Sequence, residues 1–519
     1  MREEIKEKPE VEGVSRRSVL KGAVTLGALA AGGGIALNMS MPGTAEAAAK
    51  KLPAKWDEEV DVLIIGSGFA GLAAAAEASS RGRKVLILEK MPIYGGNSII
   101  NGGEYASSDD KYHIRQKLNL GEDSTKQHFD DTMKGGDYYN NPALVKIMVE
   151  DAPATLNWMM DQGGLKMREI ASRAGGHTAY RARTCVAGVG RCFTEALKKM
   201  AEQSGVKIRL ETAVTWVWRK DWEGPVLGVE AVTGKRTKNI KIKHALVFAS
   251  GGFGQDIKMR QDFNPSITPS VNCTNHKGAT GETIRYAQAI GADALQLAFI
   301  QLYPFAEPET GILDTSAVFP FRGPGIGIVY VARTGKRYVS ELDRRDVCSR
   351  AAIATDSKPT YSIFNEKMTP LLGSAEELKK GLENGRFIKA ETLKDLAGKI
   401  DIPADVFAET IRKHNQYLAD GKDPDFNKPI TAKMLPIVDG PFYALPQWPA
   451  VHHCMGGLRI NEMAQVVDVW RKPIPRFYAA GEVAGGVHGS NRLGSNATPD
   501  AIVFGRIAGT NAAKEKPMA

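Results

Sequence analysis

Short apolar runs alternate with helix-like segments along residues 57–300. Residues 60–65 (VDVLII) and 85–88 (VLIL) are typical of strands buried in a sheet, and the alanine-rich segment that ends near Ser80 predicts a helix between them. Residues 245–249 (ALVFA) predict another buried strand, which ends at Gly251-Gly252. This alternation predicts an α/β class fold with a Rossmann-like arrangement.

The pattern changes twice further along the chain. Residues 301–450 contain an Arg/Asp-rich segment (341–350) and a charged helical stretch (375–420). Residues 451–519 return to a glycine-rich strand, turn and helix pattern. These changes divide the sequence into three segments, 57–300, 301–450 and 451–519, of which the first and last share one pattern.

The N-terminus has the layout of an export signal. Ser15-Arg16-Arg17 opens the segment, a weakly polar Gly/Ala-rich stretch follows at 22–41, and Ala45-Glu46-Ala47 fits a cleavage site for small residues. The twin arginine predicts a Tat signal over residues 1–47, cleavage near Ala47 and a periplasmic mature protein. An uncleaved anchor is the alternative, but Thr25, Asn38 and many glycines make the stretch a poor membrane span.

Composition and charge narrow the class of protein. The 519 residues are 43% hydrophobic and 24% charged, which excludes a wholly disordered chain. The net charge of +9 is diffuse, without basic runs interleaved with aromatics, so we expect no nucleic-acid partner. The excess of positive charge serves solubility, or it attracts an acidic partner or an anionic substrate.

Cysteine usage excludes several kinds of site. The five cysteines lack disulfide spacing, and no C-x-x-C-H motif occurs, so we expect no haem on this chain. No Cys/His cluster has the spacing of a zinc site, so we expect no metal.

A dinucleotide motif follows the first strand. Gly66, Gly68 and Gly71 supply a tight turn, a close approach to pyrophosphate and helix–strand packing. Glu89 ends the next strand, 23 residues past Gly66, where a carboxylate meets ribose hydroxyls. The second glycine-lined stretch, residues 95–103, and the predicted export favour FAD over a diffusible nicotinamide.

These residues, together with residues 134–137 (KGGD), 249–253 (ASGGF), 452–457 (HHCMGG) and 480–497, carry a resemblance to a known family. The chain resembles the soluble, periplasmic flavocytochrome c-type fumarate reductases and their urocanate and acrylate reductase relatives, from about Asp61 to Gly509. The resemblance implies an α/β fold in which a Rossmann-like FAD-binding domain, at 57–300 and 451–519, is interrupted by an α+β capping domain at 301–450, with the active site between them. In that family, hydride passes from the flavin to the β-carbon of an enoate while an acid protonates the α-carbon.

The resemblance implies a proton route and shows where this chain departs from it. Arg345 matches the proton-donating arginine, and Arg322 matches the relay arginine. The relay glutamate falls on Phe319, which carries no proton. Glu341, Asp343 or Asp346 are the alternatives for proton supply.

The resemblance also implies a substrate class. His452 and Arg492 match the clamp on one carboxylate, for which Arg offers a bidentate fork. The positions that hold a second carboxylate fall on Tyr303 and Val318, and Val318 and Phe319 make that end apolar. Burying an unpaired carboxylate there costs several kcal/mol, roughly. We therefore expect a monocarboxylate 2-enoate with an apolar or aromatic substituent, of the acrylate, methacrylate, cinnamate or urocanate type.

Further site residues follow from the same resemblance. Gly103 and Ser495 are expected beside the substrate. Expected FAD-binding residues are Gly66, Gly68, Ala70, Gly71, Glu89, Asn97, Ser98, Gly102, Gly103, Val214, Gly251, Glu282, His453, Glu482, Ala497 and Thr498. No histidine accompanies residues 95–96, so we expect non-covalent FAD, with electrons from a separate cytochrome c.

Three other functions stay open. A fumarate reductase is the first, if Tyr303 receives a carboxylate. A ketosteroid-type FAD dehydrogenase and a non-catalytic electron-transfer flavoprotein are the others. The His452/Arg492 clamp argues against both, because neither a steroid ketone nor an electron carrier needs it.

Overall fold

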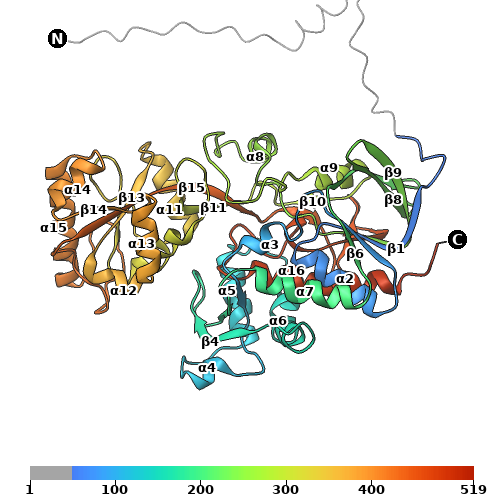
Figure 1. The fold of residues 1–519 in the computed structure, drawn as a ribbon, viewed down its shortest axis with the longest axis horizontal. Coiled ribbons are helices and arrows are strands. Elements are labelled where there is room, and N and C mark those ends of the chain that lie inside the picture. Colours follow the sequence, from blue (N-terminus) through green and yellow to red (C-terminus); the bar gives the residue numbers. More distant parts are fainter. Residues whose placement is uncertain (1–49, 519) are drawn as a thin grey trace, which may run out of the picture. The chain divides into compact units, whose positions relative to one another are not determined.

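The computed structural model describes residues 50–518 (Figure 1). The predicted Tat signal, residues 1–47, lies outside the described residues. Leu52–Ala519 form one compact unit. Within residues 50–518, no helix combines the length and the apolar character that a membrane span requires.

The largest sheet contains eight strands of the described chain, and its central strands are parallel. The order is β17-β18-β9-β1-β2-β6, with β8 beside β9 and β7 beside β8. The bounds are β1 Glu58–Ile65, β2 Val85–Leu88, β6 Lys207–Arg209, β7 Thr212–Arg219, β8 Val226–Thr233, β9 Arg236–Phe248, β17 Gln465–Val467 and β18 Pro473–Ala479. The predicted strands 60–65 and 85–88 are confirmed as β1 and β2, and 245–249 overlaps the end of β9.

Close helix packing covers this sheet. Ile64 of β1 is opposite Ile87 of β2 and Val247 of β9, and all three are fully buried. Helix α2 (Phe69–Ser80) packs between α7 (Arg191–Gln203) and α16 (Ala497–Lys514), and the three helices lie together in Figure 1. A Cβ on Gly505 of α16 would lie 2.5 Å from the Ala70 carbonyl oxygen, so α16 approaches α2 at backbone distance.

The second sheet is antiparallel and belongs to the inserted region. Its order is β11-β15-β13-β12, with β14 also paired to β15. The bounds are β11 Ile300–Ala306, β12 Val329–Val331, β13 Thr360–Asn365, β14 Ile388–Ala390 and β15 Phe442–Cys454. The helices of this region are α10 Val318–Arg322, α11 Arg345–Ala354, α12 Thr369–Leu372, α13 Ala375–Glu383, α14 Leu393–Lys399 and α15 Ala404–Asp420.

Smaller elements complete the described fold. Two three-stranded sheets have the orders β10-β16-β19 and β3-β5-β4. Their strands are β3 Glu104–Ala106, β4 Met167–Ser172, β5 Ala182–Cys185, β10 Ala294–Leu295, β16 Gly457–Arg459 and β19 Ala484–Gly485. The remaining α-helices are α3 Asn97–Ile100, α4 Ile114–Lys117, α5 Thr125–Gly135, α6 Pro142–Gln162, α8 Ile257–Phe263 and α9 Glu282–Ala289.

Two hydrophobic cores follow the two main sheets. One draws its buried residues from 60–302 and 451–513, and the other from 303–445. The change occurs within β11 and β15, which pair with each other. We call residues 301–450 the cap and the rest the nucleotide domain. Because both belong to one compact unit, domain boundaries at 300 and 450 stay a prediction.

Candidate active site

A cavity of about 1610 Å³ is lined by both the nucleotide domain and the cap. It brings together most of the predicted site residues. These are Gly66, Gly68, Ala70, Glu89, Asn97, Ser98, Gly102, Val214, Gly251, Glu282, Tyr303, Val318, Arg322, Arg345, His452, His453, Glu482, Arg492, Ser495, Ala497 and Thr498. Gly71, Gly103 and Phe319 do not line the cavity.

The direction of α10 explains why Phe319 differs from the expectation. Val318, Phe321 and Arg322 share a helix face at i, i+3 and i+4, and all three line the cavity. Phe319 is fully buried on the other side, with ring centroids 4.7 Å from Phe387 and 5.6 Å from Phe364. It therefore belongs to the cap core and does not line the cavity, contrary to the expectation from the sequence.

Gly71 and Gly103 support the cavity from behind. A Cβ on Gly71 would lie 2.0 Å from the Gly66 carbonyl oxygen, so Gly71 allows the turn to close against α2. A Cβ on Gly103 would lie 2.6 Å from the Val189 amide nitrogen. Both glycines are required for close backbone packing next to the cavity.

The nucleotide end of the cavity has the geometry of a phosphate-binding turn. Gly66 has φ +102°, and α2 begins after Gly68, with the Phe69 amide donating to the Ser98 hydroxyl at 2.9 Å. Phe69 and Ala70 line the cavity, so the N-terminus of α2, where the helix dipole favours an anion, faces it. Glu89 accepts hydrogen bonds from the Ser67 amide (3.1 Å) and hydroxyl (2.6 Å), which fixes it at the end of β2.

Two titratable groups lie at the middle of the cavity. Burial raises the pKa of Glu482 to about 7, although its Oε1 accepts a hydrogen bond from the Cys454 amide at 2.9 Å. His453 Nδ1 lies 3.8 Å from the same oxygen, and burial lowers the pKa of His453 well below its ordinary value. At neutral pH, His453 is uncharged, and Glu482 is close to its titration midpoint.

A cationic pocket lies at the opposite end. Arg492 is buried and donates from Nη2 to the Gln301 side-chain oxygen at 2.8 Å, while its Nε has no hydrogen-bond partner among residues 50–518. Burial and the nearby Arg345 lower the pKa of Arg492 to about 9. Neither guanidinium forms an ion pair with a carboxylate among residues 50–518, so the two groups together offer a site for an anion.

His452 completes this pocket. Its Nδ1 lies 2.8 Å from the Thr274 hydroxyl. Burial, Arg492 and Arg345 lower its pKa well below the ordinary value, so the ring is neutral. With the Thr274 hydroxyl donating to Nδ1, the Nε2–H of His452 is available to an anion.

Aromatic side chains surround Arg345. Its guanidinium lies 4.9 Å from the Tyr303 ring centre and 5.3 Å from the Phe321 ring centre. Tyr303 in turn lies 5.0 Å from the His452 ring and 5.3 Å from Phe305. The guanidinium of Arg345 therefore lies against aromatic rings of the cap.

The three carboxylates considered for proton supply differ in their partners. Burial alone would raise the pKa of Glu341, but Lys428 and Arg337 lower it to about 2. Asp346 accepts from Arg344 and Arg350. Among residues 50–518, the exposed Asp343 carboxylate has no hydrogen bond or ion pair, and it lines the cavity.

Sequence reasoning missed three side chains of this site. Gln301 donates from Nε2 to the Arg492 carbonyl oxygen at 2.8 Å and fixes the arginine from two sides. Glu104 accepts from the Ser495 hydroxyl at 2.7 Å and lines the cavity. Glu104 directly follows Gly103, and Gln301 is two residues before Tyr303. Both are therefore close in the sequence to residues that were predicted. Thr274 has no comparable signal.

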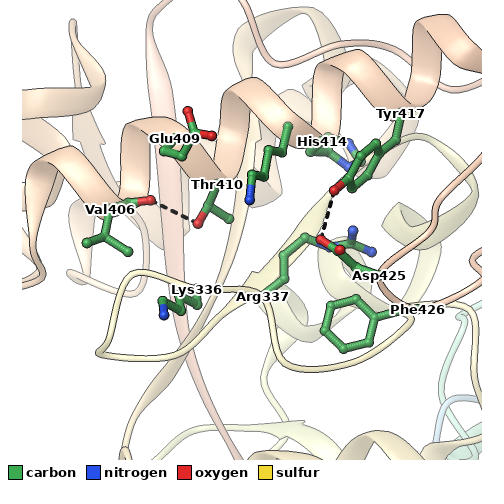
Figure 2. Close-up of a pocket in the computed structure, with 10 residues that line it drawn as sticks. Lys336, Arg337, Val406, Glu409, Thr410, His414, Tyr417, Asp425 and Phe426 are labelled. Carbon is green, nitrogen blue, oxygen red and sulfur yellow. Dashed lines mark hydrogen bonds between the residues drawn. The ribbon is translucent and has the colours of Figure 1, made fainter.

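A second cavity, of about 400 Å³, belongs to the cap alone (Figure 2). Figure 2 shows the Tyr417 hydroxyl of α15 directed at Asp425, at 3.0 Å. None of the residues that line it also lines the large cavity. Arg337 connects the two regions, because it forms two 2.9 Å hydrogen bonds with Glu341. The described residues of neither cavity include a cluster that could hold a metal ion.

Comparison with known proteins agrees with this geometry. The sequence matches the family described as "FAD binding domain" over residues 61–498. It is 36% identical to a urocanate reductase of Eggerthella lenta over 476 residues, 90% of this chain and 77% of that protein. It is 35% identical to a "Fumarate reductase (cytochrome)" of Shewanella frigidimarina over 461 residues, 88% of this chain and 77% of that one. The open conformation of a flavocytochrome c3 fumarate reductase superimposes with a TM-score of 0.76 at 29% identity, covering 98% of this chain and 82% of that chain.

Proposed function

The chain belongs to the FAD-binding family that contains these urocanate and fumarate reductases, and from this premise we propose that it is an FAD-dependent reductase of the C=C bond of a 2-enoate. The observation that carries the proposal is the cationic pocket of Arg345, Arg492 and His452. These three donors converge on one end of the cavity and lack an anionic partner among the described residues. A substrate carboxylate supplies that partner.

The residues at the other end fit FAD. The glycine turn at 66–71, the N-terminus of α2 and Glu89 match what a pyrophosphate and a ribose require. The cavity volume of about 1610 Å³ is larger than a usual small-ligand pocket and has room for a dinucleotide and a small substrate. When bound and reduced, FAD supplies the hydride. No histidine is adjacent to residues 95–96 in the sequence, which supports non-covalent attachment, and among residues 50–518 the one histidine ring within 4 Å of a Cβ on Gly96, that of His276, comes from a distant segment.

The pocket orients the substrate by its carboxylate. Arg492 offers a bidentate fork, and its side-chain contact with Gln301 fixes the plane of that fork. His452 donates from Nε2. Charge that develops on the enoate during reduction is stabilised by the same groups, and burial strengthens their effect.

Arg345 gives its proton to the α-carbon. Guanidinium is a weak acid, so Arg345 must be reprotonated after each turnover. Glu341 is held ionised by Arg337 and Lys428, and Asp346 is held by two arginines. We assign proton supply to Asp343, which is exposed and free of these pairs, with Arg322 at the same cavity wall.

The far end of the pocket selects a monocarboxylate. Val318, Phe321 and Tyr303 line it, and an unpaired second carboxylate buried against them costs several kcal/mol, roughly. Glu104 lies close enough to Tyr303 to influence its pKa and accepts hydrogen bonds, so a ring that carries an N–H also fits. Cinnamate-type and urocanate-type acids are therefore the favoured substrates.

A substrate screen tests the proposal. The enzyme is assayed with dithionite-reduced viologen as donor against acrylate, methacrylate, cinnamate, urocanate and fumarate. Oxidation of the dye by cinnamate or urocanate, with fumarate slower, is the expected result. Reduction of fumarate alone contradicts the apolar-pocket argument and identifies a fumarate reductase, the second candidate, which the Shewanella relative favours. No reaction with any enoate rejects the function.

We further propose that the enzyme works in the periplasm with a separate cytochrome c. The twin arginine at residues 16–17 and the small residues at 45–47 support Tat export. The sequence has no C-x-x-C-H, so electrons need an external donor, and the net charge of +9 suits an acidic one. Periplasmic fractionation and the N-terminal mass of the mature protein test the location. Electron transfer insensitive to salt from every candidate cytochrome contradicts charged docking.

A further inference from the structure

One arginine of the cap connects the two domains next to the proposed acid. Arg344 immediately precedes α11, whose first residue is Arg345. Its Nη1 and Nη2 donate to the two carboxylate oxygens of Asp137 at 2.6 and 3.0 Å. Its Nε and Nη2 also donate to the two oxygens of Asp346 at 3.0 and 3.1 Å. A single guanidinium therefore holds one carboxylate of its own helix and one of the nucleotide domain.

Asp137 is itself fixed by the segment that carries the carboxylate clamp. It follows α5 and has φ +53°, a left-handed conformation that is uncommon for a residue other than glycine. Its Oδ2 accepts a hydrogen bond from the Ser490 hydroxyl, and the Ser490 amide donates to the Gly136 carbonyl oxygen at 3.0 Å. Ser490 lies two residues before Arg492. The Asp137 carboxylate thus connects the start of α11 to the Arg492 turn.

We propose that the Asp137–Arg344 pair is a latch that sets the position of Arg345 relative to Arg492. Asp137 and Arg344 are positioning residues, because neither lines the cavity. The proposal rests on the reductase function proposed above. It adds that the pair fixes the position of the cap, which carries the proposed acid Arg345, relative to the nucleotide domain, which carries Arg492 and His452.

Charge gives the latch its role. Arg345 and Arg492 repel each other, which is one cause of the lowered pKa of Arg492. Glu482 and Glu104 offset part of this charge, but neither guanidinium forms an ion pair with a carboxylate among the described residues, so before an anionic substrate enters the remaining repulsion favours separation of the two domains. The two hydrogen bonds from Arg344 to Asp137 oppose that separation from outside the pocket. Both side chains of the pair are partly exposed, at 36% and 43%, so the effect is moderate and depends on salt.

The latch predicts a particular kinetic signature. The clamp residues Arg492 and His452 lie in the nucleotide domain, so loss of the latch leaves carboxylate binding and KM nearly unchanged. Delivery of the proton by Arg345 slows, and kcat falls about fivefold, the effect of losing a well-oriented exposed pair. The solvent deuterium isotope effect on kcat rises, because proton transfer limits the rate more strongly.

The test is a double-mutant cycle on the FAD-loaded enzyme. D137N and R344Q each lower kcat about fivefold at constant KM and constant flavin content, and the double variant is no slower than the slower single variant. R350Q is the matched control, since Arg350 also bonds Asp346, at 2.8 Å, but does not touch Asp137. It is expected to behave as wild type.

Each other outcome overturns the latch. Multiplicative effects in the double variant show that the two residues act separately. A rise in KM without a loss of kcat assigns the pair to binding, and an equal loss in R350Q assigns it to the stability of α11. Wild-type activity in D137N rejects the latch and leaves the reductase function intact, whereas an inactive wild-type enzyme rejects the function itself.

Discussion

We propose that the hydroxyl of Thr274 sets which ring nitrogen of His452 carries the proton. The two groups lie 2.8 Å apart, and the ring is neutral because burial and two arginines lower its pKa. A neutral imidazole has one N–H. While Thr274 donates to Nδ1, that N–H is on Nε2 and points away from Thr274. Thr274→Val removes the donor and leaves Nδ1 without a partner.

The size of the effect follows from the bond that is lost. The ring either keeps an unpaired buried Nδ1 or changes tautomer and turns an acceptor toward the carboxylate. A hydrogen bond to a charged group contributes about 1.5–3 kcal/mol, so kcat/KM for a carboxylate substrate falls roughly 10- to 150-fold. Most of the loss is in KM, because the bond is already formed when the substrate binds.

The assay is steady-state reduction of the preferred enoate with a reduced viologen, on protein of measured flavin content. Thr274→Ser is the matched control because it keeps the hydroxyl, and its KM is expected to stay within about twofold of wild type. An unchanged KM in Thr274→Val refutes the reasoning. A Thr274→Ser variant as impaired as Thr274→Val shows that the methyl group matters rather than the hydrogen bond.

Three further predictions concern the acid, the glycine turn and the buried carboxyl. Arg345→Ala lowers kcat at least about 100-fold, since it removes the proton donor, while the flavin absorbance of the purified protein stays unchanged; substantial activity would reject the acid assignment. In Gly66→Ala the new Cβ would lie 2.4 Å from the Ala249 carbonyl oxygen, in a backbone conformation with φ +102°. This variant is expected to be less stable by about 3 kcal/mol in thermal melts and to bind less FAD in flavin titrations. The control Gly82→Ala, which has φ +77° but open space around its Cβ, is expected to keep its FAD. Burial raises the pKa of Glu482 from the ordinary value of 4.5 to about 7 in the folded protein. Between these two pH values the folded apoprotein therefore binds more protons than the unfolded chain. Glu482 contributes about 3 kcal/mol to the free energy of unfolding below pH 4.5, and this contribution is lost as the pH rises through 7. Chemical denaturation of the apoprotein at several pH values measures that slope, and a Glu482→Gln variant with the same slope would contradict it.

The fold and the nucleotide end of the site were predictable because their signals are local. Apart from Asp61, which is partly buried, residues 60–65 and 85–88 are apolar and buried, and they lie in β1 and β2. Gly66 and Glu89 lie at the ends of those strands. A turn, a helix start and an acid at fixed spacing are read from the sequence without knowledge of distant contacts.

The substrate end was predictable only in part, because its contacts join distant segments. Thr274 and His452 are 178 residues apart, and Asp137 and Arg344 are 207 apart, and no local pattern links them. Phe319 shows a different limit. Its position in the sequence placed it beside Val318, but a helix turns neighbours to different faces, so Val318 reaches the cavity and Phe319 joins the cap core.

In the proposed reaction, an enoate with a single carboxylate takes a hydride from the reduced flavin of this protein. The most direct test is a single turnover in which anaerobically reduced enzyme is mixed with cinnamate, urocanate or fumarate, and flavin reoxidation is followed by its absorbance in a stopped-flow instrument. We predict rapid reoxidation by cinnamate or urocanate, with formation of the saturated acid, and slower reoxidation by fumarate. A flavin that stays reduced with both monocarboxylates, or that is reoxidised only by fumarate, would contradict the account.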